Sequence, residues 1–558
     1  MNTTIDTIVI FVFSAFVLGI GMLFVRTGKN LKSFFAGGEA VPWVIGGVSL
    51  FMSFFSAGTF VAWGSIAYQH GWVAITIQWT MAIGAFVAAF WLAPKWKKTG
   101  NLTAAEYIQQ RLGDTVQRTF VNIFLAISVF SKGVVLYPVS KLVSSSLGFP
   151  LTPTTVVLGI FMISYTSVGG LWAVMVTDIL QFVVLLAAVI IILPLTSSAI
   201  GGFSQFQERA PDDFFNLLNG EFNGWFIAAF TLYHIFYIGG NWTFVQRYTS
   251  VDSPFSAKKV ALLFGCLYLI SPVIWMLPPM MYKVINPALA DPENAYLEVC
   301  KLVLPPGLMG LMLTGMYFST SATANTTLNV VSAIFTNDVY KNIFNPTASD
   351  KKLISVARMS SWAFGIGMIL IALIVPAIGG MVEVVLSIAS ITAGPLLAPP
   401  LWALFSKKLS GKTTLLITLS TLAINLFCKV MLPILFDIKL DRGSQMAIGA
   451  GLPLLLLALN ELFRRELSAD YIKYKNRNVI VVPQHIEDAA QAEVQEQNHF
   501  GLKVIGGALA FTALLLFILS VITPTGKRLT AGVGVLIMLS AIIPYRAAWK
   551  IKPLIARK

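Results

Sequence analysis

Long apolar stretches recur along the whole of this chain, and many are close to the ~20 residues that cross a bilayer as a helix. Only 11% of its 558 residues are charged, whereas a soluble domain carries about 25%. The alternating segments of about ten residues that mark transmembrane β-strands are not visible. The pattern predicts an all-α polytopic membrane protein with about 15 transmembrane spans. They lie near residues 5–26, 42–68, 72–93, 118–147, 153–168, 171–197, 224–244, 260–282, 306–335, 354–377, 381–405, 413–436, 445–463, 501–522 and 529–546.

Basic residues gather in short tracts between these spans, so the net charge of +14 indicates topology rather than a nucleic-acid partner. With the N-terminus outside, the tracts at 95–98, 247–259 and 407–412 all fall on the cytoplasmic side, and the acidic loop 198–223 falls on the other. The distribution predicts a multi-pass protein of the plasma membrane with a cytoplasmic C-terminus. Its expected partners are the lipid bilayer and a small polar solute, and the sequence indicates no obligate protein partner. The polar stretch 466–500 is typical of a solvated cytoplasmic linker.

Two spans contain small and polar residues typical of broken helices. The second span contains Ser53 to Thr59, and the seventh contains Gly239-Gly240-Asn241. Irregular backbone at membrane depth is tolerated only where it is buried or lines a cavity. Inverted five-helix repeats place their broken first helices five spans apart, as here. The alternative is that these small residues only let helices pack closely.

The ninth span carries a dense run of hydroxyl and amide residues from Ser319 to Asn329. Residues 319, 323 and 326 lie on one face of a helix. Hydroxyls beside free carbonyl oxygens suit a hard cation, which prefers oxygen ligands. The alternative is that these hydroxyls bond to carbonyls of their own helix.

Three ionisable residues fall inside spans, where such groups are a functional hypothesis by default. Lys132 and Asp178 either pair with one another or bind a solute or an ion; Asp178 is alternatively interfacial. His234 is either a hydrogen-bonded packing residue or a ligand. Gln78 beside Trp79 suits a sugar-like or zwitterionic solute, and it equally suits hydrogen bonding between helices.

No enzyme signature is visible: the sequence has no nucleotide-binding loop, no HExxH and no Ser/His/Asp set in a loop. Rings of charge or a carbonyl filter, which a channel would need, are also not visible. The three cysteines are widely separated and predict neither a disulfide framework nor a metal motif. These observations favour a transporter over an enzyme or a channel.

Four sequence motifs, taken together in order and spacing, resemble the sodium/solute symporter family, which includes sodium–glucose, sodium–proline and sialic acid transporters. They are Ser56-Ala57-Gly58-Thr59-Phe60, Leu171-Trp172-Ala173 with Thr177-Asp178, Val245-Gln246-Arg247-Tyr248, and Phe335-Thr336-Asn337-Asp338. The resemblance covers roughly residues 1–465. It implies a LeuT-like core of two inverted five-helix repeats after one leading helix. The implied division is 1–41 (leading helix and loop), 42–223 (first repeat), 224–410 (second repeat), 411–465 (additional helices), 466–500 (linker) and 501–558 (two C-terminal helices and tail).

The resemblance also implies site residues. The family's sodium ligands fall on the carbonyl oxygens of Met52, Phe55 and Ser319 and on the hydroxyl of Thr323. Where the family often has two adjacent hydroxyl residues, this chain has Ala322-Thr323, so one side-chain ligand is missing. In members with a second sodium site, the matching positions are Asp178, Asn325 and Thr326. The implied solute contacts are Ser56, Thr59, Gln78, Lys132, His234 and Tyr237.

The expected function is therefore sodium-coupled symport of a small polar organic solute by alternating access, with Na⁺ as the coupling ion and a sugar or sugar derivative as the favoured solute. A buried cation such as Lys132 equally suits the carboxylate of an organic anion or amino acid. The missing hydroxyl at Ala322 motivates a third hypothesis, a non-transporting sensor of the same fold.

Overall fold

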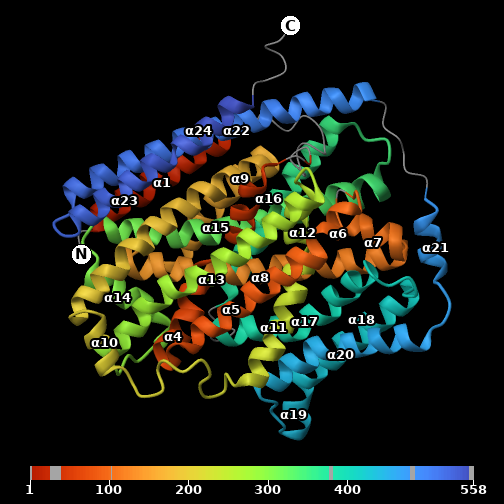
Figure 1. Ribbon diagram of the computed structural model, residues 1–558, viewed down its shortest axis with the longest axis horizontal. Coiled ribbons are helices and arrows are strands. Elements are labelled where there is room, and N and C mark those ends of the chain that lie inside the picture. Colours follow the sequence, from red (N-terminus) through yellow and green to blue (C-terminus); the bar gives the residue numbers. More distant parts are fainter. Residues whose placement is uncertain are drawn as a thin grey trace.

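The computed structural model describes residues 3–24, 39, 41–101, 103–375, 381–477 and 484–551. Within these residues every regular element is a helix, apart from one isolated bridge between Asn219 and Phe222. Figure 1 shows the helices packed into one bundle, with the C-terminal helices lying along an edge beside the first helix. Most of the predicted loop between the first two spans, residues 27–41, lies outside the described residues.

Every predicted span coincides with a helix, and the two predicted spans 153–168 and 171–197 share a single one. The helices are α1 (Thr3–Leu23), α3 (Trp43–Phe54) with α4 (Gly64–His70), α5 (Val73–Val87) with α6 (Ala93–Lys98), α8 (Asp114–Leu147), α9 (Leu151–Ile200), α11 (Gly224–Gly240) with α12 (Trp242–Thr249), α13 (Pro254–Ile285), α15 (Leu308–Ile334), α16 (Asp350–Ile374), α17 (Met381–Ala403), α18 (Gly411–Leu426), α20 (Arg442–Phe463), α22 (Gln484–Ile522) and α23 (Lys527–Ser540) with α24 (Ile542–Lys550).

Length and composition explain which helices qualify as membrane spans on their own. Among the described residues, 11 helices are long and apolar enough to cross a bilayer, or up to 12 if α3 and the helix after it form one bent span. Leu151–Ser164 and Gly224–Gly240 are apolar but shorter. Helix α15 is long enough, and the hydroxyl run lowers its hydropathy. The polar helix is entirely buried, so its neighbours, rather than lipid, surround the hydroxyls.

The predicted break in the second span is present. Helix α3 ends at Phe54, and Phe55 is extended with φ −76° and ψ 134°. The chain then returns to helix through a π-helical segment, η2 (Thr59–Trp63), that continues into α4. The two halves, Trp43–Phe54 and Thr59–His70, are bent by 64°.

The second predicted break also occurs, at Asn241. Helix α11 ends at Gly240, Asn241 is extended with φ −63° and ψ 128°, and its side-chain oxygen accepts from the Thr243 backbone N–H at 3.0 Å to cap α12. A Cβ on Gly239 would lie 2.2 Å from Leu92 Cδ1. Gly239 and Gly240 therefore agree with both interpretations of this segment, because they precede a break in the helix and also allow close helix packing.

The leading helix holds the start of α15 through a buried carboxylate. Asp6 is fully buried in α1, and its Oδ1 accepts from the backbone N–H groups of Gly307 and Gly310, each at 2.7 Å. The first N–H groups of a helix have no partner within it. Asp6 therefore caps α15 from another helix, a role that no sequence motif of capping residues could indicate.

We expect Asp6→Ala to lower stability by about 2 kcal/mol, because loss of a capping side chain costs 0.5–2 kcal/mol and this one is shielded from water. The apparent melting temperature of the purified protein in detergent measures the effect. Asp6→Asn keeps an acceptor oxygen and is expected to lose less. Equal melting of Asp6→Ala and the wild type would contradict this role.

The segment predicted as a solvated linker is partly docked. Helix α21 (Ala469–Lys475) packs against α7 (Ala104–Leu112), with the Tyr474 and Tyr107 rings 6.0 Å apart. Asp470 Oδ2 accepts from the Gly411 backbone N–H at 2.8 Å. Residues 478–483 of the predicted linker lie outside the described residues, and Gln484 already begins α22.

Candidate ion and solute site

The break after α3 releases carbonyl oxygens from helical hydrogen bonding. In a continuous helix Met52 O would accept from Ser56 N–H, but that N–H points to Thr59 Oγ1 at 3.4 Å. Phe55 O would accept from Thr59 N–H, which instead donates to Ser56 O at 2.9 Å. The extended residue Phe55 thus leaves two backbone oxygens available inside the protein.

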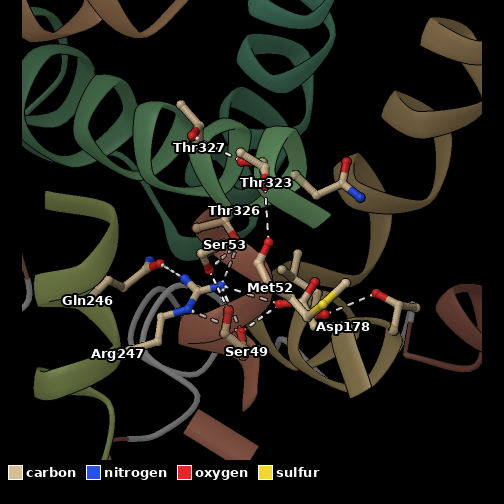
Figure 2. Close-up of polar contacts among 12 residues, drawn as sticks. Ser49, Met52, Ser53, Asp178, Gln246, Arg247, Thr323, Thr326 and Thr327 are labelled. Atoms are coloured by element: carbon tan, nitrogen blue, oxygen red, sulfur yellow. Dashed lines mark hydrogen bonds and ion pairs between the residues drawn. The ribbon is translucent and has the colours of Figure 1, made fainter. Parts of the chain in front are cut away.

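Thr323 on α15 faces both oxygens. Its hydroxyl donates to Met52 O at 3.0 Å and to Phe55 O at 2.5 Å, and its side chain is buried. Figure 2 shows this side chain directed from α15 toward Met52. We call these three atoms the oxygen cluster. Such a cluster fits a hard monovalent cation, because backbone carbonyls of unwound transporter helices coordinate Na⁺.

Most other hydroxyls of the α15 run bond within their own helix, as the alternative interpretation held. Ser319 and Thr320 donate to Met316 O at 2.8 Å and 3.1 Å, and Thr327 donates to Thr323 O at 3.2 Å. Thr320 also accepts from the Ala57 N–H at 2.9 Å. Most residues of the run therefore form hydrogen bonds within α15. A few, above all Thr323, form hydrogen bonds to α3 and to the turn after it. Ligation by the Ser319 carbonyl stays a prediction.

A second polar cluster surrounds the buried guanidinium of Arg247 (Figure 2). Arg247 Nη2 donates to Thr326 Oγ1 at 2.8 Å and to Ser49 Oγ at 3.1 Å, and lies 3.8 Å from Asp178 Oδ2. Ser49 Oγ donates to the same carboxylate oxygen at 2.5 Å. Thr326 Oγ1 also lies 3.0 Å from Ser53 Oγ. We call these five residues the arginine cluster.

The arginine cluster corrects one interpretation. The partner of Asp178 is Arg247 rather than Lys132. Arg247, which the sequence places in a cytoplasmic basic tract, is fully buried, and so is Asp178. An interfacial depth for Asp178 stays a prediction. Of the predicted second sodium site, Asp178 and Thr326 belong to this cluster, while Asn325 Nδ2 donates to Ser321 Oγ at 3.2 Å. That site stays a prediction.

A cavity of about 200 Å³ adjoins the oxygen cluster, and four predicted solute contacts lie on its wall: Ser56, Thr59, Lys132 and Tyr237. Thr323 also reaches the wall, so the ion and solute positions adjoin. The wall described here contains no acidic residue. Further polar groups that sequence analysis did not single out as solute contacts are Ser128, Ser131, Tyr233, Asn241, Thr243, Thr327 and Thr392.

Two predicted solute contacts lie behind that wall. Gln78 is fully buried, and its Oε1 accepts from Trp275 Nε1 at 3.3 Å. His234 is also fully buried, with Nδ1 2.6 Å from Thr80 Oγ1. Both side chains hold helices together in this conformation. Their contact with a solute stays a prediction.

A broken-helix bundle with an oxygen cluster beside a polar cavity defines an ion-coupled secondary transporter. A model of the sodium:solute symporter family matches residues 34–419, and the chain belongs to this family. The predicted LeuT-like fold class is confirmed, and the coupling ion is Na⁺. The family consists of transporters rather than enzymes.

Known relatives handle different solutes. The sodium/glucose cotransporter of Vibrio parahaemolyticus is 25% identical over 467 residues, which is 76% of this chain and 85% of that protein. The human sodium-coupled monocarboxylate transporter 1 is 26% identical over 411 residues, covering 68% and 65% of the two chains. A substrate-bound, outward-open Na⁺-coupled sialic acid symporter superimposes with a TM-score of 0.73 at 20% identity, covering 83% of this chain and 99% of that one. The structural likeness shows the fold, and the relatives leave the solute open.

Proposed function

We propose that this protein couples inward Na⁺ flow to uptake of a small organic anion whose carboxylate binds Lys132. The observation that carries the proposal is the charge of the cavity. Lys132 lies on its wall, and the described residues provide the ammonium with no ion pair and the wall with no carboxylate. A cation without a counter-ion on the wall of a cavity between membrane-spanning helices favours an anionic ligand.

A neutral sugar or polyol is the second candidate. The wall supplies hydroxyls from Ser56, Thr59, Tyr237 and several other residues, which could bond to sugar hydroxyls. Names of relatives support both candidates, because they include glucose and monocarboxylate transporters. A hydroxylated acid would use both sets of groups.

In the proposed cycle Na⁺ binds in the oxygen cluster and holds the end of α3 against α15. The solute then binds in the adjoining cavity, and each ligand raises the affinity for the other by linkage. The proposed orientation in the plasma membrane has the N-terminus outside and the C-terminus in the cytoplasm. It places α3 and α12 on the cytoplasmic side of their breaks.

We expect Lys132→Gln to lower the affinity for carboxylates by about 10- to 100-fold, because a hydrogen bond to a charged group contributes roughly 1.5–3 kcal/mol. Uptake into right-side-out vesicles with an inward Na⁺ gradient measures this, after a screen of radiolabelled monocarboxylates, sugar acids, amino acids and sugars. Lys141→Gln, on the same helix and paired with Asp291 at 3.9 Å, is the matched control.

Four outcomes would decide among the hypotheses. Carboxylate uptake that survives Lys132→Gln unchanged would contradict the anion proposal, and sugar uptake in the wild type would favour the second candidate. Sodium-dependent ligand binding with no flux would favour a sensor. Uptake driven by a proton gradient and not by Na⁺ would overturn the assignment of the coupling ion to this chain.

A further inference from the structure

We propose that Arg247 is a positioning residue for the oxygen cluster, and that Asp178 is the counter-charge of Arg247 rather than a sodium ligand. The inference deepens the proposed function and rests on its sodium site. It assigns a role to a guanidinium that the sequence analysis placed in a cytoplasmic basic tract.

The contacts of Arg247 reach both walls of the oxygen cluster. The Thr326 hydroxyl accepts a hydrogen bond from Arg247 Nη2 at 2.8 Å. Thr326 lies three residues after Thr323 on α15. Thr326 in turn pairs at 3.0 Å with Ser53, the residue next to Met52. A bond between Ser53 and Thr326 fixes how far the Met52 carbonyl stands from the Thr323 hydroxyl. The guanidinium of Arg247 holds Thr326, the residue of that pair on α15, in place.

The guanidinium is itself held on three sides. Its Nε and Nη2 donate to Ser49 Oγ at 3.2 Å and 3.1 Å, and Nη1 donates to Gln246 Oε1 at 2.7 Å. Ser49 Oγ in turn donates a hydrogen bond to Asp178 Oδ2 at 2.5 Å. The charges of Arg247 and Asp178 are both fully buried. A buried charge is tolerated when it is paired and hydrogen-bonded. Asp178 Oδ2 meets both conditions, whereas Asp178 Oδ1 has no hydrogen-bond partner among the described residues.

Asp178 is directed at Arg247 and Ser49 rather than at the oxygen cluster. In the described part of the chain, the hydrogen bond and the ion pair of Asp178 Oδ2 go to Ser49 and Arg247, and neither involves Met52, Phe55 or Thr323. The carboxylate therefore acts on sodium through the arginine. Arg247 lies on α12, after the break at Asn241, and Ser49 lies on α3, before the break at Phe55. The arginine cluster therefore also links α12 to α3.

Binding of ²²Na⁺ to the purified protein in detergent tests this without any solute. Contacting residues interact strongly enough that Arg247→Gln and Asp178→Asn should each weaken ²²Na⁺ affinity by about tenfold. Each single variant leaves one buried charge without its partner. The double variant Asp178→Asn/Arg247→Gln removes both charges and keeps polar side chains of similar shape. It should bind ²²Na⁺ no more weakly than Arg247→Gln alone, because Asp178 then has no arginine to act through.

Arg111→Gln is the matched control, because Arg111 is also buried and donates to the Ser406 and Leu409 carbonyls, away from the oxygen cluster. Arg111→Gln should lower the melting temperature and leave ²²Na⁺ affinity unchanged. A double variant that binds clearly more weakly than Arg247→Gln would overturn the inference, and so would loss of one of two bound Na⁺ ions in Asp178→Asn. No ²²Na⁺ binding to the wild type would instead refute the sodium site of the proposed function.

Discussion

Thr323→Val is expected to weaken the Na⁺ dependence of uptake severely while leaving the protein folded. Valine matches threonine in shape and lacks the oxygen that completes the cluster with Met52 O and Phe55 O. Ala322, the neighbouring position, offers only a methyl group, so no adjacent hydroxyl substitutes for it. We expect the apparent Na⁺ affinity to fall by about a hundredfold, which corresponds to about 2.7 kcal/mol.

The matched control is Thr314→Val on the same helix, because Thr314 is equally buried and its hydroxyl donates only to the Gly310 carbonyl, at 2.7 Å. Initial uptake rates over a range of Na⁺ concentrations separate the two variants. Wild-type Na⁺ dependence in Thr323→Val would place the sodium site elsewhere.

Gly449→Ala is expected to destabilise the protein by about 3 kcal/mol or more, since overpacking usually costs 1–3 kcal/mol and here two backbones collide. The backbones of helices α17 and α20 are in close contact where the two helices cross. A Cβ on Gly449 would lie 2.1 Å from Ser390 O, and one on Gly394 would lie 1.9 Å from Gly449 O. Small residues at such crossings let membrane helices approach closely.

Gly451 provides the control on the same helix, because a Cβ there meets no atom within 4 Å. Gly451→Ala should be neutral or slightly stabilising, as alanine favours helix over glycine. Yield of monodisperse protein and apparent melting temperature report both effects. Equal behaviour of the two variants would mean that α17 and α20 can separate at little cost.

The fold was largely predictable because hydropathy and helix-breaking residues report directly on spans and breaks. The Ser53–Thr59 and Gly239–Asn241 segments each interrupt a helix as expected. The continuity of α9 was not predictable, because Gly169-Gly170 between two apolar segments is compatible with either a loop or a helix. Docking of α21 depends on contacts with α7, which lies far away in the chain.

The site was predictable only where position along a helix was sufficient. The motif match placed Thr323 opposite the first break, and the structure brings it to Met52 and Phe55. Arg247 was misplaced because a basic residue near the end of a span looks like a loop residue under the positive-inside rule. The Val-Gln-Arg-Tyr motif was the available signal. For Gln78 and His234, the sequence indicates how far along its helix each residue lies. It does not indicate which side of the helix faces the cavity, and neither residue lies on the cavity wall.

The bond from Asp6 to the start of α15 bears on any attempt to make a minimal transporter. Trimming the chain to its ten-helix core would delete the only acceptor that the described structure gives the Gly307 and Gly310 N–H groups. The helix that carries Thr323 would then begin with bare donors where water does not reach. Shortened versions should therefore retain the first helix, or supply a replacement carboxylate in its place.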